Sequence, residues 1–96
     1  MAVQTVGVIG AGQMGNGIAH VLSQSGYYVL LNDVNQDELD RAIERVRKNM
    51  DRQLRSGKIS AEEIDAAMRR IKTTLDLAEL GTSDLIIEAA TEDEIG

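Results

Sequence analysis

The sequence predicts an α/β domain built on an open, doubly wound parallel sheet. Three observations predict it: short aliphatic runs alternate with segments of helical periodicity, the first run ends at a cluster of glycines, and no proline interrupts these elements. With 96 residues, 43% of them hydrophobic, the chain has material for one modest aliphatic core. We therefore expect a single domain.

Composition excludes several classes of function. Sixteen acidic and ten basic residues give a formal net charge of -6, the wrong sign for a nucleic-acid binder. The absence of cysteine excludes a disulfide, a thiolate nucleophile and a cysteine-based zinc site. The apolar run over residues 6–12 is too short to span a bilayer, and no basic region precedes it. We expect a cytoplasmic protein that binds neither nucleic acid nor membranes.

The first three elements are expected to form a strand–helix–strand unit. Residues 3–9 (VQTVGVI) and residues 28–32 (YVLLN) are typical of short buried strands. Between them, residues 13–25 predict a helix that Gly26 stops. Its apolar residues recur at three- and four-residue spacing: Met14, Ile18, Val21 and Leu22. Two strands joined through such a crossover pair in parallel.

A long helical hairpin is expected after the second strand. Asn35 is the expected N-cap of its first helix, and the Glu38 carboxylate is expected to accept a hydrogen bond from the Asn35 N–H in return. Gly57 is expected to end that helix, and Ser60 with Glu63 predicts a capping box for the next. The apolar stripes of the two helices comprise Leu39, Ala42, Ile43, Val46, Met50 and Leu54, then Ile64, Ala67, Met68 and Ile71.

Two further strands and a helical turn complete the predicted order. Residues 73–75 predict a short strand, residues 76–80 one helical turn, and residues 84–90 (DLIIEAA) a further buried strand. A complete dinucleotide-binding sheet has about six strands, so this one is truncated. Either residues outside the chain finish the sheet, or the last strand exposes an edge that pairs with another copy, giving a homo-oligomer.

The residues with a chemical signature follow the first strand. Residues 10–15 (GAGQMG) match G-x-G-x-x-G, open a predicted helix, and are followed about 20 residues later by Asp33 at the end of the second strand. In this pattern Gly10 permits the tight turn, Gly12 lets the backbone approach a pyrophosphate, and Gly15 allows close packing of helix on strand. The sequence therefore favours a Rossmann-type dinucleotide site over a turn without a ligand.

Asp33 is the residue expected to select the cofactor. Its carboxylate can accept hydrogen bonds from both hydroxyls of an adenosine ribose, and its charge repels the extra phosphate of NADP. No Arg or Lys lies between Val29 and Glu38 to attract that phosphate. NAD is therefore favoured. Two alternatives stay open: FAD, which also binds such fingerprints, and an Asp33 that merely begins the turn before the next helix.

The remaining candidates have ordinary structural interpretations. His20, the one histidine, lies within the first helix away from the glycine turn and is interpreted as a partly exposed structural residue. Met14, Met50 and Met68 are expected to fill the core. The acidic residues 92–94 follow the last strand, where ligands bind in this fold, and a solvated turn explains them equally well. No metal site and no catalytic triad are predicted.

Three segments, VGVIGAGQMGNGIAHVLSQSGYYVLLND, EIDAAMRRI and DLIIEAATE, resemble the amino-terminal part of the 3-hydroxyacyl-CoA dehydrogenase family. The resemblance extends over essentially all 96 residues. It rests on M-G-N-G-I-A after the glycine turn, the helical hairpin after the second strand, and E-A-A-T-E after the fourth strand. It implies NAD-linked interconversion of a 3-hydroxyacyl-CoA and a 3-oxoacyl-CoA by hydride transfer. It also implies that residues 1–96 are an amino-terminal dinucleotide-binding domain, incomplete at its carboxyl end.

The resemblance also assigns site residues. Its cofactor contacts comprise the pyrophosphate loop Gly10, Ala11, Gly12, Gln13, Met14 and Gly15, the ribose-binding Asp33, and the nicotinamide-side residues Ala90 and Glu92. Weaker contacts to CoA are implied on the hairpin around Asn49, Arg55 and Lys58.

The family's catalytic histidine and glutamate, and its substrate and dimerisation domain, come later in the chain than Gly96. The chain alone is therefore expected to have no catalytic residue and no activity. A different Rossmann oxidoreductase, such as a 3-hydroxyisobutyrate-type dehydrogenase or a flavoprotein, and a non-catalytic dinucleotide-binding module remain alternatives.

Overall fold

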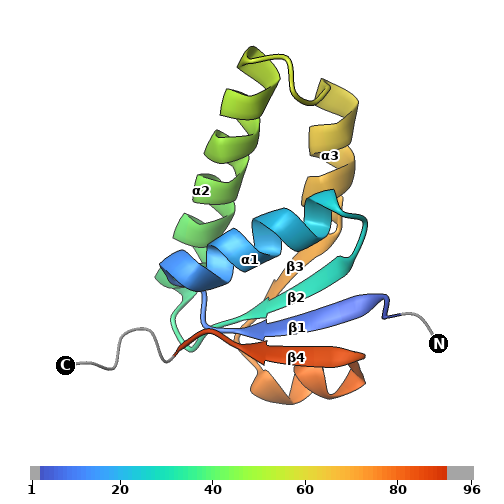
Figure 1. Cartoon of the computed structure of the whole chain (residues 1–96). Helices are drawn as coiled ribbons and strands as arrows, with labels where there is room; N and C mark the ends of the chain where they lie inside the picture. Colours follow the sequence, from blue (N-terminus) through green and yellow to red (C-terminus); the bar gives the residue numbers. More distant parts are fainter. Residues whose placement is uncertain (1–2, 91–96) are drawn as a thin grey trace.

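The computed structural model describes residues 3–90, which form a four-stranded sheet and its helices (Figure 1). The elements in chain order are β1 (Thr5–Ile9), α1 (Gln13–Gln24), β2 (Tyr28–Asn32), α2 (Gln36–Arg55), α3 (Ala61–Arg69), β3 (Ile71–Thr74), the 3₁₀ helix η1 (Leu77–Thr82) and β4 (Leu85–Glu88). All three pairs of neighbouring strands are parallel, in the order β3-β2-β1-β4. The chain winds to one side of β1 and then to the other, which confirms the predicted doubly wound α/β sheet.

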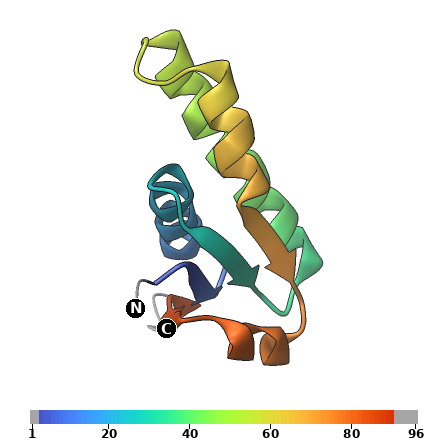
Figure 2. The same ribbon diagram turned by 90° about the vertical axis from the view of Figure 1, so that its right-hand side faces the viewer.

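The two faces of the sheet are covered unequally. Helices α1, α2 and α3 lie on one face and η1 lies on the other (Figures 1 and 2). The buried core lies mainly between the sheet and the three helices, and comprises Val6, Val8, Val29, Leu31, Leu39, Ala42, Val46, Met50, Ile64, Ala67 and Ile71, with smaller contributions from Ala11, Ala19 and Ala89. On the opposite face Leu80 of η1 packs against Gly7, where a Cβ atom would lie 2.9 Å from Leu80 Cγ.

Most predicted elements are present with small shifts in their bounds. The first strand begins at Thr5 instead of residue 3, and the third strand covers Ile71–Thr74 instead of residues 73–75. The predicted helical turn is the 3₁₀ helix η1, and the Asp76 side chain caps it by accepting a hydrogen bond from the Ala78 N–H. Among the described residues, no helix is long and apolar enough to cross a membrane.

The caps of the helical hairpin are partly as predicted. Ser60 and Glu63 form both halves of the predicted capping box of α3. The Asn35 side chain caps α2, but the predicted return bond from Glu38 is wrong. The Asn35 N–H donates to Asp33 Oδ1 at 3.1 Å, and the Glu38 carboxylate pairs with Arg41. The carboxylate of Asp33, two residues upstream, has taken the donor that a capping box would use.

Two expectations about burial are wrong. Residues 84–90 were expected to form a buried strand, but β4 is an edge strand on which Leu85 and Ile86 remain 49% and 47% exposed. No helix or further strand of residues 3–90 covers its outer side. Met14 was expected in the core but is 46% exposed. It shares a flank of α1 with Val21, which also faces solvent, whereas Met50 is fully buried and Met68 packs against the core as expected.

Asp84 fastens the start of β4 to the start of β1. Its carboxylate Oδ2 accepts hydrogen bonds from the backbone N–H groups of Gln4 at 2.9 Å and Thr5 at 3.0 Å. These two hydrogen bonds hold the pKa of Asp84 below its ordinary value, and the bond from Gln4 has the larger effect. Because this pKa is lowered in the folded state, the stabilisation is present above the unfolded-state pKa near ~4 and is lost as the pH falls further.

We expect Asp84→Asn to lower the thermal midpoint at pH 7, because the amide loses the charge that strengthens both bonds. The difference from the unmodified chain should shrink as the pH falls below ~4, where Asp84 itself becomes protonated. Circular dichroism melts between pH 2.5 and 7 measure both effects. Asp65→Asn, which removes an exposed carboxylate from α3, is the control. Equal melting of Asp84→Asn and the unmodified chain at pH 7 would show that this contact contributes nothing.

Candidate dinucleotide site

Three strand ends meet at one edge of the sheet. Ile9 at the end of β1 is in register with Asn32 of β2 on one side and Glu88 of β4 on the other. The residues that follow these strands therefore come together where the chain reverses its winding direction around β1. In open α/β sheets this switch point is where ligands bind.

The turn after β1 has a backbone that side chains would obstruct. Gly10 has a positive φ of 101°, donates its N–H to the Asn32 carbonyl at 2.7 Å, and lies against Ala90, whose Cα a Cβ atom on Gly10 would approach to 2.8 Å. A Cβ atom on Gly15 would overlap the Gly10 carbonyl oxygen. The glycines at both ends of the turn therefore allow α1 to begin directly against β1 and β4, as the sequence predicts.

The N-terminus of α1 has no side-chain cap. Its N-cap is Gly12, and its first turn contains no acidic residue. By contrast, α2, α3 and η1 are each capped by a side chain, from Asn35, Ser60 and Asp76 respectively. The first N–H groups of a helix have no partner within the helix and carry the positive end of its dipole. In α1 these groups face the edge of the sheet where the strand ends meet, which suits an anion.

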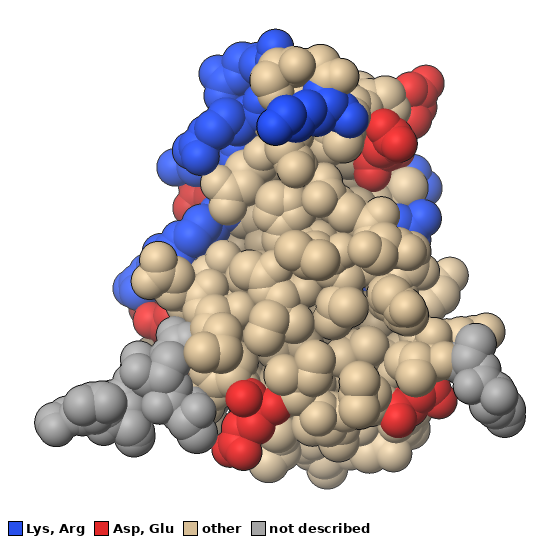
Figure 3. Space-filling model, in the orientation of Figure 1, with Lys and Arg blue, Asp and Glu red and all other residues tan. Residues whose placement is uncertain are grey.

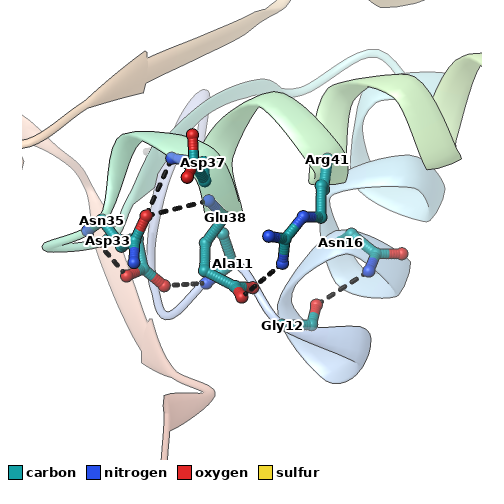
Figure 4. A network of polar contacts seen from close by, with 8 residues as sticks. All are labelled: Ala11, Gly12, Asn16, Asp33, Asn35, Asp37, Glu38 and Arg41. Carbon is teal, nitrogen blue, oxygen red and sulfur yellow. Dashed lines mark hydrogen bonds and ion pairs between the residues drawn. The ribbon is translucent and has the colours of Figure 1, made fainter.

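Asn16 holds the start of α1 in place. It is 4% exposed, and its Nδ2 donates to the Gly12 carbonyl at 2.8 Å (Figure 4). The Asn16 backbone N–H donates to the same oxygen at 2.9 Å. From the sequence, Asn16 is distinguished only as part of M-G-N-G-I-A. The signal that marks it is an amide side chain in the first turn of a helix that starts at a glycine.

Asp33 joins the glycine turn to the start of α2 (Figure 4). Its Oδ2 accepts a hydrogen bond from the Ala11 N–H at 2.9 Å, and its Oδ1 accepts one from the Asn35 N–H at 3.1 Å. Each carboxylate oxygen can accept a further hydrogen bond. Half-buried Asp33 thus both orders the turn and retains acceptor capacity at the site.

The charges around Asp33 are mostly negative. Asp37 and Glu38 occupy the first turn of α2. The nearest cation along this helix is Arg41, whose guanidinium bonds Glu38 Oε2 at 3.2 Å. A phosphate beside Asp33 would be repelled by the Asp33 carboxylate and by those of Asp37 and Glu38. The surroundings therefore favour a neutral sugar hydroxyl over a sugar phosphate.

The structure brings together most of the predicted cofactor contacts. Residues 10–15, Asp33 and Ala90 all lie at this edge, with Gln13 and Met14 exposed in the first turn of α1. The predicted contact Glu92 lies outside the described residues. A hollow of about 640 Å³ lies elsewhere, at the amino ends of the strands beside Thr5 and Tyr28. We place the dinucleotide site by its backbone geometry.

The helical hairpin carries a second candidate site. A hollow of about 290 Å³ lies between α1 and the hairpin, and its lining comprises His20, Asn49, Arg52, Gln53, Ser56 and Lys58. Of the three residues expected to contact CoA, Asn49 and Lys58 line this hollow and Arg55 does not. His20 is half-buried, as expected, and its Nε2 lies 3.3 Å from Gln53 Oε1.

Known proteins resemble the chain in sequence over nearly all of its length. Residues 5–95 match the family described as 3-hydroxyacyl-CoA dehydrogenase, NAD binding domain. A 3-hydroxybutyryl-CoA dehydrogenase of Bradyrhizobium diazoefficiens is 44% identical over 96% of this chain and 31% of its own length. A 3-hydroxyadipyl-CoA dehydrogenase of Escherichia coli is 41% identical over 94% of this chain and 19% of its own length. The chain thus spans a third or less of these relatives.

Solved structures agree with this similarity. The (S)-3-hydroxybutyryl-CoA dehydrogenase of Ralstonia eutropha superposes with a TM-score of 0.92 at 34% identity, over 96% of this chain and 32% of that one. A lactate dehydrogenase of Cryptosporidium parvum superposes with a TM-score of 0.61 at 23% identity, over 94% of this chain and 26% of that one, which shows a shared fold alone.

We expect Gly15→Ala to lower the free energy of unfolding by about 3 kcal/mol, the upper end of the usual cost of overpacking, because the added methyl overlaps the Gly10 carbonyl. Gly17→Ala, two residues further along α1, is the matched control. No atom lies within 4 Å of its Cβ position, so alanine should raise stability by about 0.5–1 kcal/mol through its helix propensity. Urea denaturation measures both values. Similar effects of the two substitutions would contradict the close approach.

Proposed function

The chain belongs to the 3-hydroxyacyl-CoA dehydrogenase family, of which residues 5–95 are the NAD-binding domain, and from this membership we propose how it binds NAD and what the protein does. We propose that the glycine turn and Asp33 hold NAD and that the protein interconverts 3-hydroxyacyl-CoA and 3-oxoacyl-CoA. The relatives' names include 3-hydroxybutyryl-CoA and 3-hydroxyadipyl-CoA dehydrogenases, which supports this substrate class.

The observation that carries the proposal is the uncapped start of α1 beside the Asp33 carboxylate. A diphosphate at this start accepts hydrogen bonds from N–H groups of the first turn and meets the positive end of the helix dipole. The absence of side chains at Gly10, Gly12 and Gly15 lets the diphosphate approach the backbone closely. The residues present therefore fit the diphosphate of a dinucleotide.

Asp33 is proposed to bind the adenosine ribose. The lone pairs not used by Ala11 and Asn35 can accept hydrogen bonds from the two ribose hydroxyls. The carboxylates of Asp33, Asp37 and Glu38 oppose a phosphate on that sugar, which supports NAD as the cofactor and disfavours NADP. The Ala11 N–H is already oriented by Asp33, so little reorganisation of the turn is needed when the cofactor binds.

Ala90 is proposed to lie on the nicotinamide side, with Glu92 following it. Ala90 lies two residues after the end of β4, and its backbone packs against Gly10. The end of β4 therefore lies across the turn from Asp33, which is the side where the second half of a dinucleotide extends. When bound, NAD supplies the acceptor for the hydride of the hydroxyl-bearing carbon. The part of this chain in that step is to fix the position and orientation of the cofactor.

The proton transfer of the reaction is proposed to depend on other parts of the protein. His20, the one histidine, bonds Gln53 at the hairpin and lies away from the glycine turn. We propose that residues 1–96 are the amino-terminal dinucleotide-binding domain of a longer enzyme, whose further domain supplies the proton acceptor and the rest of the substrate cleft. The share of the relatives that the chain covers, 31% and 19%, supports this division.

The hairpin hollow is proposed to bind a phosphate of CoA. Arg52 and Lys58 supply two cations, and Asn49 supplies an amide donor. Arg55, the third residue that the sequence resemblance implied, is absent from the lining. The hollow lies on the same side of the sheet as α1, so one molecule can bind the cofactor at the turn and the acyl carrier at the hairpin.

A cytoplasmic location and self-association complete the proposal. Bacterial relatives support the location, although relatives from Brassica napus and Arabidopsis thaliana carry glyoxysomal and peroxisomal in their names. Self-association is supported by the exposed apolar side chains of the edge strand β4.

We expect this chain to bind NADH, measured by fluorescence titration, and Asp33→Ala to weaken binding roughly 10- to 100-fold through loss of charged acceptors for the ribose. The preference for NADH over NADPH should shrink with it. Asp33→Asn, which keeps one oxygen for the turn, should weaken binding less. Asp37→Asn removes a charge nearby and is the control. Failure of the unmodified chain to bind NADH, or equal losses in Asp33→Ala and Asp37→Asn, would refute the site.

The hairpin hollow predicts that Lys58→Gln raises the dissociation constant for CoA roughly three- to tenfold, because one charged contact to a phosphate is lost. Isothermal titration calorimetry with CoA measures the change. Arg47→Gln removes the same charge from the other flank of α2 and should leave the affinity within twofold. A loss of the same size in both variants would show that net charge, and not the hollow, sets the affinity.

A further inference from the structure

Helix α2 carries an unbroken row of cations along one flank. Arg41, Arg45, Lys48, Arg52 and Arg55 are spaced four, three, four and three residues apart, which places them on one side of the helix. All five are exposed. With a rise of 1.5 Å per residue, the row is about 21 Å long. We call these five residues the cationic stripe.

The acidic residues of α2 border the cationic stripe on both sides. Given 3.6 residues per turn, Asp40 and Asp51 lie about 80–100° around the helix axis from the centre of the stripe, Asp37 and Glu44 lie at one edge of it, and Glu38 lies at the other. Of the stripe, only Arg41 forms an ion pair among residues 3–90, with Glu38. Pairs at i,i+4 spacing are available to Lys48 with Glu44 and to Arg55 with Asp51, but the structure forms neither. Four of the five cations therefore have no ion-pair partner among residues 3–90.

The helix dipole explains only part of the cationic stripe. Arg52 and Arg55 lie in the last turn of α2, where cations interact favourably with the dipole. Arg41, Arg45 and Lys48 lie further toward the N-terminus, outside the turn in which this effect acts. In a chain with a formal net charge of -6, residues 41–55 carry six cations, the five of the stripe and Arg47, against Glu44 and Asp51, so this segment has the opposite sign of charge.

The cationic stripe connects the two candidate sites. At its lower end, Arg41 reaches from α2 toward the first turn of α1 (Figure 4). Near the C-terminal end of α2, Arg52 of the stripe lines the hairpin hollow together with His20 of α1. In Figure 3 Lys and Arg follow α2 along the left-hand edge of the molecule to the hairpin tip, while few acidic residues interrupt them.

We propose that the cationic stripe is an electrostatic guide that accelerates the capture of nucleotide diphosphates and directs them to the two sites. This inference rests on the proposed function, since it takes the turn and the hollow as the places where such anions bind. A row of like charges beside a binding site raises the local concentration of a charged ligand and its association rate, and the effect falls with ionic strength. The stripe acts on the rate of arrival and needs no contact with the bound ligand.

The test compares two double variants with the same change in net charge. Arg45→Glu with Lys48→Glu reverses the middle of the stripe, away from both sites. Arg69→Glu with Lys72→Glu makes the same change in α3 and β3, beside the hollow at the amino ends of the strands. Stopped-flow fluorescence with NADH gives association and dissociation rate constants, and a parallel arm with CoA, by competition with a fluorescent CoA analogue, shows whether the stripe serves cofactor, substrate or both.

At about 20 mM salt, where charges interact over roughly 20 Å, we expect the stripe variant to bind NADH roughly fivefold more slowly, with an unchanged dissociation rate constant. The control variant should change less than twofold. At 500 mM salt the difference should vanish. The neutral pair Arg45→Gln with Lys48→Gln should slow association about twofold to threefold. It provides the same test if the charge-reversed pair does not fold.

Slower association of NADH or of CoA in the stripe variant alone supports the proposal. Equal slowing in the control variant, a change confined to the dissociation rate constant, or slowing that persists at 500 mM salt overturns it. If the unmodified chain does not bind NADH at any salt concentration, the result is different, because it overturns the proposed function itself.

Discussion

The contact on which the rest of the structure depends is the approach of α1 to the end of β1. Gly15 lies so close to the Gly10 carbonyl that no side chain fits between them. This closeness directs the first-turn N–H groups of α1 toward the switch point of the sheet and also sets the direction of α1 across it. The hairpin packs against α1 through the Gln53 amide, which bonds both His20 and Gln24. The position of the hairpin hollow therefore depends on the same two glycines.

Asp33 shows how one side chain serves order and recognition together. Before any ligand binds, its carboxylate is already held by two backbone N–H groups from segments that are far apart in the sequence. Those bonds fix the direction of the lone pairs that remain. A side chain that is already oriented loses little conformational entropy when a ligand binds, so more of the interaction energy contributes to affinity. The Asn16 amide likewise orders the first turn of α1 before a ligand binds, by donating to the Gly12 carbonyl.

The sequence predicts what local chemistry determines. The order of elements along the chain, the glycine turn, the Asp33 position and the Ser60–Glu63 box follow from periodicity, glycine placement and capping residues. The failures have separate causes. Glu38 has no capping role because the Asp33 carboxylate, only two residues upstream, accepts the Asn35 N–H in a local turn. Met14 and β4 are exposed because periodicity marks an apolar face without showing what covers it. The cationic stripe has no counterpart in these predictions, because the periodicity that predicts a helix is that of its apolar residues.

The two hydrogen bonds that Asp84 accepts at the surface also affect the opposite end of the sheet. They tie together the beginnings of β1 and β4, the two neighbours whose far ends carry Gly10 and Ala90. Since paired strands transmit register along their whole length, a slip at the beginning would displace Ala90 from Gly10 by a full residue and turn its side chain to the opposite face. The Asp84 carboxylate at the amino ends of β1 and β4 thus helps to keep Gly10 and Ala90 aligned at the carboxyl ends of the same strands.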